Sequence, residues 1–223
     1  ATVFICGRKP EGIEKAAGEI NTQGFAGRAV PVVAHVGKSE DLASLVAKAK
    51  EPTGKIDVLV NNAATNIAQG PCLEFDDAQF DKMVDVNLKS VYRLVNAVAP
   101  VMIAGGGGSV INIASVAGVR PQMQSLLYSM TKAALIMMTK SYALELGPQN
   151  VRVNAIAPGL IQTVLSEYFW KDEGRREEFI GGQPIRHLGQ PQEIADVALL
   201  LASGKSSYLT GQTIVVDGGY LIT

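Results

Sequence analysis

The sequence predicts a single α/β domain built on a parallel β-sheet. Short apolar runs alternate with longer amphipathic segments along the 223 residues, a pattern typical of repeated strand–helix–strand units. Hydrophobic residues make up 47% of the chain and charged residues 18%, which indicates a globular protein with much buried sheet. A chain of this length has one sizeable core.

The first part of the chain contains two helices between apolar strands. The strands are expected at residues 2–6, 29–36 and 56–61. A helix at 10–23 has Pro10 in its first turn and Gly24 at its C-terminal stop. The next helix opens with Ser39 as N-cap, followed by acidic residues in the first turn, and it ends before Pro52.

The second part of the chain continues the alternation. Later strands are expected at residues 109–114, 151–157 and 213–217, and helices at 125–146 and 191–203. A loop with a short helix follows residue 61, and a long helix then runs from about residue 76 or 81 to residue 103. Gly105 to Gly108 form a flexible turn before the next strand. Residues 160–190 show no regular period.

Composition excludes several classes of function. The net charge of −1 gives no electrostatic reason to expect nucleic acid or an anionic membrane as a partner. No apolar run is long enough to span a bilayer, and no secretory leader is recognisable at the start. Cys6 and Cys72 lack metal-ligand spacing, so we expect no metal site and two reduced thiols, as in the cytoplasm.

Three polar residues predict a site for carbonyl/alcohol redox chemistry. Tyr128 and Lys132 lie four residues apart, which places them on one face of the helix expected at 125–146. An ammonium beside a phenol lowers the tyrosine pKa from about 10, making tyrosine a usable acid/base near neutral pH. Ser115 follows the strand at 109–114, at the end where open α/β sheets bind ligands. The Tyr-x-x-x-Lys spacing alone would more often indicate a core tyrosine and a solvated lysine; the motifs that accompany it favour the functional interpretation.

Further motifs accompany these residues in a fixed order. They are Asn61-Asn62-Ala63-Ala64 after a strand, Asn87 in the long helix, Pro158-Gly159 after another strand and Asp217-Gly218-Gly219 near the end. In this order and spacing the sequence resembles the short-chain dehydrogenase/reductase family over essentially the whole chain. The resemblance implies a Rossmann-like, doubly wound parallel sheet with strand order 3-2-1-4-5-6-7.

The start of that family's fold has no counterpart in this sequence. The strand at 2–6 leads into Gly7-Arg8-Lys9-Pro10, and no Gly-x-x-x-Gly-x-Gly turn precedes it. Strand 1, which is central in the expected order, is therefore missing, and its loss would leave unpaired backbone groups on both neighbouring strands. We expect residues 1–223 to be one N-terminally incomplete oxidoreductase domain. A truncated isoform without activity is the alternative.

The resemblance implies roles for the catalytic residues. Tyr128 would be the acid in carbonyl reduction and the base in alcohol oxidation. Lys132 would lower its pKa and bind the nicotinamide ribose. Ser115 would hydrogen-bond the substrate oxygen, although a strand-end cap is its alternative role. Asn87 would link Lys132 to a proton path through a local helix irregularity and a bound water; otherwise it is a polar helix residue satisfied by backbone.

The resemblance also places cofactor contacts after the strands. Asn61 and Ala63 would border the adenosine and its ribose. Pro158-Gly159 would let the backbone approach the nicotinamide, and Ile161 and Thr163 would contact the carboxamide. Each of these segments would otherwise be a simple loop after a strand.

The turn at residue 8 favours NADP(H) over NAD(H). NAD-selective sites need an acid at this position to bind the ribose 2′-hydroxyl, but the chain has Arg8 and Lys9, which suit a 2′-phosphate. His35 stands where family members commonly carry the aspartate that meets adenine, so it would bind or stack on adenine, or else be a core histidine. Val36 lies in the same cofactor tract, which is similar to that of NADP-dependent carbonyl and retinal reductases.

Residues 160–190 are expected to form a lid over a small-molecule carbonyl or alcohol. The aromatic cluster Tyr168-Phe169-Trp170 suits an apolar substrate body, or else pins the lid to the core or to a neighbouring subunit. The long helices 81–103 and 125–146 are apolar around much of their circumference, and the resemblance implies homodimers or a homotetramer. The expected activity is NADP(H)-dependent interconversion of a carbonyl and a secondary alcohol. A 3-oxoacyl-carrier-protein reductase and an inactive scaffold are the alternatives.

Overall fold

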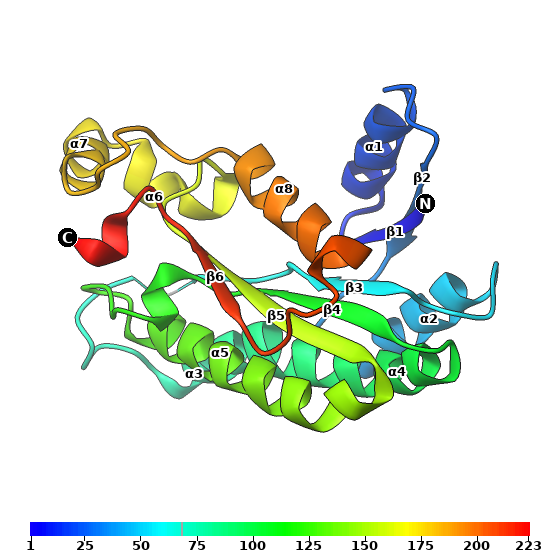
Figure 1. Cartoon of the computed structure of the whole chain (residues 1–223). Helices are drawn as coiled ribbons and strands as arrows, with labels where there is room; N and C mark the ends of the chain where they lie inside the picture. The colour runs from blue at the N-terminus through cyan, green and yellow to red at the C-terminus, as the bar shows by residue number, and fades with distance from the viewer. Residues whose placement is uncertain (68) are drawn as a thin grey trace.

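In the computed structural model, which describes residues 1–67 and 69–223, six parallel strands form two sheets. The smaller sheet pairs β1 (Thr2–Gly7) with β2 (Arg28–Val33). Figure 1 shows this pair, in blue, on the β3 side of the larger sheet. Helix α1 (Pro10–Asn21) connects the two strands. The side chain of Asn21 accepts a hydrogen bond from the Ala29 N–H and donates one to the Ala29 carbonyl, which ties the end of α1 to β2.

The larger sheet has the order β3-β4-β5-β6. Its strands are β3 (Val58–Asn61), β4 (Gly108–Ile113), β5 (Val151–Pro158) and β6 (Thr213–Val216). All neighbouring strands are parallel, with Asn61 opposite Asn112 and Asn112 opposite Ala155. The carboxyl ends of these strands therefore meet at one edge, where open α/β sheets bind ligands.

The two sheets confirm the expected strand order. The sequence β2-β1, then β3-β4-β5-β6, corresponds to strands 3-2 and 4-5-6-7 of the order inferred above. No described strand occupies the place of strand 1 between β1 and β3. Apolar side chains on the two facing strands are accordingly exposed: Val3 by 52%, Val58 by 37% and Val60 by 46%.

Helices cover both faces of the larger sheet. One face carries α4 (Ser90–Ala104) and α5 (Leu126–Leu146), with α2 (Ser39–Lys50) packed beside α4. The other face carries α8 (Pro191–Ala202), and α1 lies on the same side (Figure 1). Adjacent residues of β4 point to opposite cores, as alternation requires: Val110 packs with α4 and α5, and Ile111 packs with α8.

Several helix boundaries differ from the expectations. Ser39 is wrong as an N-cap: Lys38 holds that position and Ser39 is the first helical residue, without a side-chain cap. The long helix consists of α3 (Asp77–Val84), a π-helix η1 (Asp85–Lys89) and α4. Segment 160–190 contains two helices that periodicity did not indicate, α6 (Glu167–Trp170) and α7 (Glu173–Gly181). Within the described part of the chain, no helix combines the length and apolar character needed to cross a membrane.

Candidate active site

Ser115 lies directly beyond β4, at the carboxyl edge of the sheet. It is buried and extended, and it is the N-cap of the short 3-10 turn Val116–Gly118 (η2). Its Oγ accepts a hydrogen bond of 3.1 Å from the Ala117 N–H. This is the cap geometry that the alternative interpretation predicts, yet the same hydroxyl lies close enough to Tyr128 to lower the pKa of its phenol. One hydroxyl therefore serves the turn and faces the phenol.

Tyr128 and Lys132 lie on the first turns of α5, with both side chains toward the end of β4. Lys132 is only 3% exposed, and its Nζ donates a 2.7 Å hydrogen bond to the Ile113 carbonyl. The ammonium lies 5.5 Å from the centre of the Tyr128 ring. The structure thus brings Ser115, Tyr128 and Lys132 together, as the sequence spacing indicated.

The electrostatics of the pair differ from the expectation. Burial raises the pKa of Tyr128, and the nearby Ser115 hydroxyl acts in the opposite direction. Burial lowers the pKa of Lys132 from 10.5 to about 8. The expected lowering of the tyrosine pKa by Lys132 is therefore not seen here, because the ammonium bonds the Ile113 carbonyl rather than the phenol oxygen. Desolvation, not charge pairing, dominates both groups.

Asn87 lies at the centre of the π-helix η1, which is the helix irregularity that the resemblance implied. Its Oδ1 accepts a 2.8 Å bond from the Thr65 N–H, and its Nδ2 donates to the Thr65 carbonyl at 2.9 Å. Nδ2 also donates to the Thr131 hydroxyl at 3.1 Å. Since Thr131 precedes Lys132, Asn87 joins the loop after β3 to helix α5. The structure shows no direct contact between Asn87 and Lys132.

A chain of buried amides links the sheet to α5. The Asn61 Nδ2 donates to Asn112 Oδ1 at 2.8 Å, and the Asn112 Nδ2 donates to the Thr139 hydroxyl at 2.9 Å. Thr139 in turn donates to the Leu135 carbonyl. Sequence reasoning missed Asn112 and Thr139; a polar residue inside the apolar run Val110–Ile113 was the available signal. Asn61 is 6% exposed, and its own Oδ1 has no partner in the described residues.

Arg8 and His35 follow the carboxyl ends of neighbouring strands. The Gly7 carbonyl accepts a 3.0 Å bond from the Ala34 N–H, which aligns the two ends. Arg8 is exposed and forms no ion pair with the described residues. The half-buried His35 accepts a bond from the Gly37 N–H at Nδ1, and its backbone N–H donates to Asp41. His35 is therefore a turn residue rather than a core histidine, and Val36 beside it is also half-buried.

The nicotinamide side of the expected cofactor site lies after β5. The Gly159 N–H donates to the Val216 carbonyl at 2.9 Å, and a Cβ on Gly159 would lie 2.8 Å from Asp217 Cα. Pro158 ends β5, so the turn begins where the strand pairing stops. Glycine is needed here because β5 and β6 approach so closely.

Ile161 and Thr163 lie at the beginning of segment 160–190. Ile161 bridges to Gly189, which closes the segment at its base. The Thr163 carbonyl accepts a 2.8 Å bond from the Trp170 indole N–H. Trp170 thus pins α6 to this turn, which is the structural alternative for one member of the aromatic cluster.

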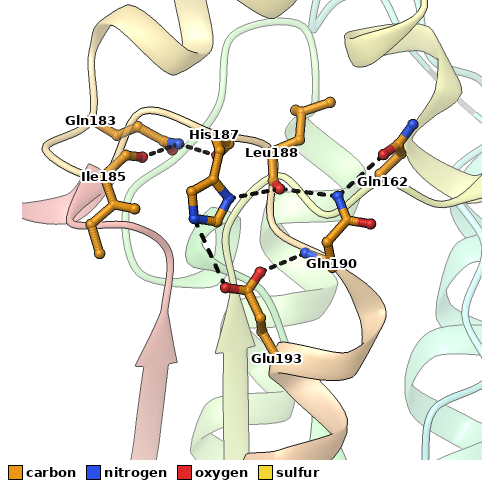
Figure 2. A network of polar contacts seen from close by, with 7 residues as sticks. All are labelled: Gln162, Gln183, Ile185, His187, Leu188, Gln190 and Glu193. Atoms are coloured by element: carbon orange, nitrogen blue, oxygen red, sulfur yellow. Dashed lines mark hydrogen bonds and ion pairs between the residues drawn. The ribbon is translucent and has the colours of Figure 1, made fainter.

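A polar network fastens the other end of the segment (Figure 2). The Gln183 Nε2 donates to the carbonyls of Ile185 and His187, each at 2.7 Å. The Gln190 side chain donates to Gln162 at 3.2 Å, and the Gln190 N–H donates to Glu193 at 2.7 Å. The network joins residues near both ends of segment 160–190. The middle of the segment, which contains α6 and α7, is the more exposed part.

The residues on both sides fit a nicotinamide dinucleotide. The orphaned Asn61 Oδ1 and the unpaired Arg8 would provide polar groups for the expected adenosine half. The Pro158-Gly159 turn and Lys132 would border the expected nicotinamide half. The 223 residues contain no glycine-rich turn for the pyrophosphate. No group of three acidic, histidine or cysteine side chains in the described ranges could hold a metal ion.

Comparison with known proteins agrees with this geometry. Residues 1–221 match a family model described as enoyl-(acyl carrier protein) reductase. The chain is 41% identical over 219 residues to rabbit dehydrogenase/reductase SDR family member 4, covering 98% of this chain and 84% of the relative. It is 37% identical over 222 residues to the 3-oxoacyl-[acyl-carrier-protein] reductase FabG of Thermotoga maritima, covering 100% and 88%.

Solved structures give the same result. One match is a protein from Sinorhizobium meliloti that is described as a putative short-chain alcohol dehydrogenase. Its TM-score is 0.93 and its sequence identity 33%, covering 100% of this chain and 87% of that one. A gluconate 5-dehydrogenase from Burkholderia cenocepacia, in complex with NADP and tartrate, matches with a TM-score of 0.92 and 30% identity, covering 100% of this chain and 86% of that one.

Replacing Lys132 with Met removes one titrating group from the core. The pKa of Lys132 is about 8 in the folded state, compared with 10.5 for an ordinary lysine side chain. Between these values the unfolded state binds more protons, so the contribution of Lys132 to stability rises with pH. We expect the unfolding free energy of the wild type, minus that of Lys132→Met, to rise across this window by up to about 3 kcal/mol. Urea titrations at several pH values measure it.

Lys140→Met is the matched control, because Lys140 is an exposed lysine on the same helix. Its stability should follow that of the wild type at every pH. Parallel pH curves for Lys132→Met and the wild type would contradict the buried-ammonium interpretation.

Proposed function

Because the chain belongs to the short-chain dehydrogenase/reductase family, we propose that it interconverts a small-molecule carbonyl and a secondary alcohol with NADP(H). Family membership makes it an oxidoreductase acting on CH–OH or carbonyl groups. The observation that carries the finer proposal is the convergence of Ser115, Tyr128 and Lys132 at the carboxyl edge of the sheet.

The three side chains divide the chemistry between them. A bound nicotinamide would supply the hydride in reduction and accept it in oxidation. Ser115 donates a hydrogen bond to the substrate oxygen and stabilises the charge that develops there. Tyr128 gives its proton to that oxygen in reduction and removes it in oxidation. Burial keeps the phenol protonated, which suits the reductive direction.

Lys132 is placed to hold the cofactor and to return the proton. Its pKa of about 8 lets it exchange a proton close to neutral pH. We infer that it bonds the nicotinamide ribose and tunes Tyr128 once the cofactor is bound. Asn87 positions this helix through Thr131, and we propose that a water beside it completes the proton path.

NADP(H) is preferred over NAD(H) in this proposal. Arg8 is exposed and unpaired among the described residues, and its guanidinium matches a ribose 2′-phosphate bidentately. His35 and Val36 border the adenine, Asn61 and Ala63 the adenosine side. The NADP complex of the Burkholderia protein gives general support. Pro158-Gly159, Ile161 and Thr163 form the expected wall beside the nicotinamide.

A 3-oxoacyl-carrier-protein reductase is the second candidate, because the Thermotoga relative carries that name. Such an enzyme needs free basic residues for an acidic carrier protein. Arg175 is occupied by the Tyr168 ring and carbonyl, and Arg176 lies 3.4 Å from Glu173. These contacts disfavour docking at the lid. Absence of acetoacetyl thioester reduction would exclude this candidate.

The lid and the assembly complete the proposal. Segment 160–190 would close over the substrate from its fastened base. Apolar residues on the outer faces of α4 and α5 are exposed, including Tyr92, Met137 and Leu144. We propose that these faces pair in a homodimer or homotetramer. Both cysteines are free, which is in keeping with a cytoplasmic location.

Tyr128→Phe tests the proposed function. The change removes the acid/base hydroxyl but keeps the ring, so turnover of a ketone should fall by at least about 100-fold, while NADPH affinity changes little. Steady-state kinetics and fluorescence titration measure the two effects. Tyr92→Phe, an exposed tyrosine on α4, should behave as the wild type. Persistent activity in Tyr128→Phe would remove the assignment.

Arg8→Ala tests the cofactor preference. Loss of a charge-assisted contact of about 1.5–3 kcal/mol should weaken NADPH binding roughly 10- to 100-fold and leave NADH binding nearly unchanged. Arg28→Ala is the control, because Arg28 lies at the opposite end of the β1–β2 sheet. Equal losses for both cofactors would count against a 2′-phosphate site. Binding of neither cofactor by the wild type would favour an inactive scaffold.

A further inference from the structure

One aromatic ring near the end of the chain joins helix α7 to the loop after Ser115. Tyr220 belongs to the short turn Tyr220–Ile222 (η6). Its ring stacks on Phe179 of α7, with ring centres 4.5 Å apart and planes at 11°. The guanidinium carbon of Arg120 lies over the same ring, 4.1 Å from its centre. Each face of a ring has room for one stacked group, so the Tyr220 ring lies between Phe179 on one face and Arg120 on the other. Figure 1 shows α7 beside this C-terminal turn.

Arg120 is rigidly connected to the catalytic residues. It comes five residues after Ser115, and its N–H donates to the Val116 carbonyl at 2.9 Å. Within the same loop, a Cβ on Gly118 would lie only 2.6 Å from the backbone of Lys132. The loop therefore packs directly on the helix that carries Tyr128 and Lys132. Because the two segments are in such close contact, a displacement of Arg120 would also displace the site.

Helix α7 depends on few apolar contacts. Its charged residues 173–178 are mostly exposed, and Phe179 and Ile180 are its partly buried apolar residues. Beyond its end, the Ile185 N–H donates to the Gly218 carbonyl at 2.9 Å. A Cβ on Gly219, whose φ is +88°, would lie 2.8 Å from Pro184. The C-terminal turn thus meets the lid at several points. At α7 itself, Tyr220 stacks on Phe179, and the Thr223 hydroxyl donates a 2.6 Å hydrogen bond to the carbonyl of Gly182, the C-cap residue of the helix.

We propose that Arg120, Tyr220 and Phe179 form a latch that holds lid helix α7 over the substrate and couples it to the loop carrying Ser115. The inference rests on the proposed function in taking segment 160–190 as the lid. Tyr220 is then a positioning residue that touches neither substrate nor cofactor. At Tyr220 the latch acts through the two ring faces, and Arg120 also donates a 2.7 Å hydrogen bond to the carbonyl of Thr223.

Limited proteolysis of the full chain tests the latch without requiring turnover. Trypsin cleaves after Lys171, Arg175 and Arg176, all within the lid, and cleavage tracks the population of the open form. Tyr220→Leu should accelerate cleavage at these sites about tenfold, because loss of the stacked ring and the cation–π contact favours opening. If the wild type reduces a ketone, the same variant should raise its KM about tenfold with unchanged NADPH affinity.

Two tyrosine variants serve as controls. Tyr220→Phe keeps the ring and should cleave as the wild type, and so should Tyr208→Leu, whose tyrosine is fully exposed at 101%. Wild-type cleavage in Tyr220→Leu, or equal cleavage in the Phe and Leu variants, overturns the latch. Should Tyr220→Leu fail to fold, Arg120→Met decides: faster lid cleavage supports the latch and an unchanged rate overturns it. If the wild type reduces no carbonyl, the proposed function is refuted but the latch is not. The cleavage rates of the variants test the latch independently.

Discussion

The hydrogen bond from the Lys132 ammonium to the Ile113 carbonyl is the contact on which the site depends. It joins the first turns of α5 to the end of β4, two residues before Ser115. Burying an ammonium there is costly unless hydrogen bonds compensate, and the lowered pKa records that cost. Because a strand end and a helix are fixed to each other at this point, Ser115 and Tyr128 face each other without a flexible link. A group retained in so unfavourable a place points to chemistry rather than stability.

Buried polar side chains extend this arrangement to neighbouring elements. Asn87 fastens the loop after β3 to α5 through Thr65 and Thr131, and the π-helix gives its side chain the required position. The Asn61–Asn112–Thr139 chain fixes β3, β4 and α5 in one register. Such buried hydrogen-bond networks specify one arrangement of their elements, whereas apolar packing alone tolerates small shifts. The hydrogen bonds thus hold β3, β4 and α5 in fixed positions beneath the more exposed segment 160–190.

Much of this fold follows from sequence, because parallel strands and their connecting helices carry strong periodic signals. The strands, the strand order and the meeting of Ser115, Tyr128 and Lys132 were expected and are found. The direction of the Tyr128 pKa shift was wrong, since spacing gives proximity but not where an ammonium points. Helix α7 was missed because its charged sequence has little amphipathic period. The stack of Arg120 on Tyr220 joins residues 100 positions apart, a contact that no local pattern could indicate.

Isotope transfer tests the central claim, that this site moves a hydride to a carbonyl carbon, most directly. The purified chain is incubated with NADPH carrying deuterium at the transferring position of nicotinamide C4, together with a panel of ketones, and the alcohols are analysed by mass spectrometry. The proposed function predicts an alcohol with one deuterium on the carbinol carbon and none on oxygen, which would receive its proton from Tyr128. An alcohol without carbon-bound deuterium, or NADPH that binds tightly yet transfers nothing to any ketone, would contradict it.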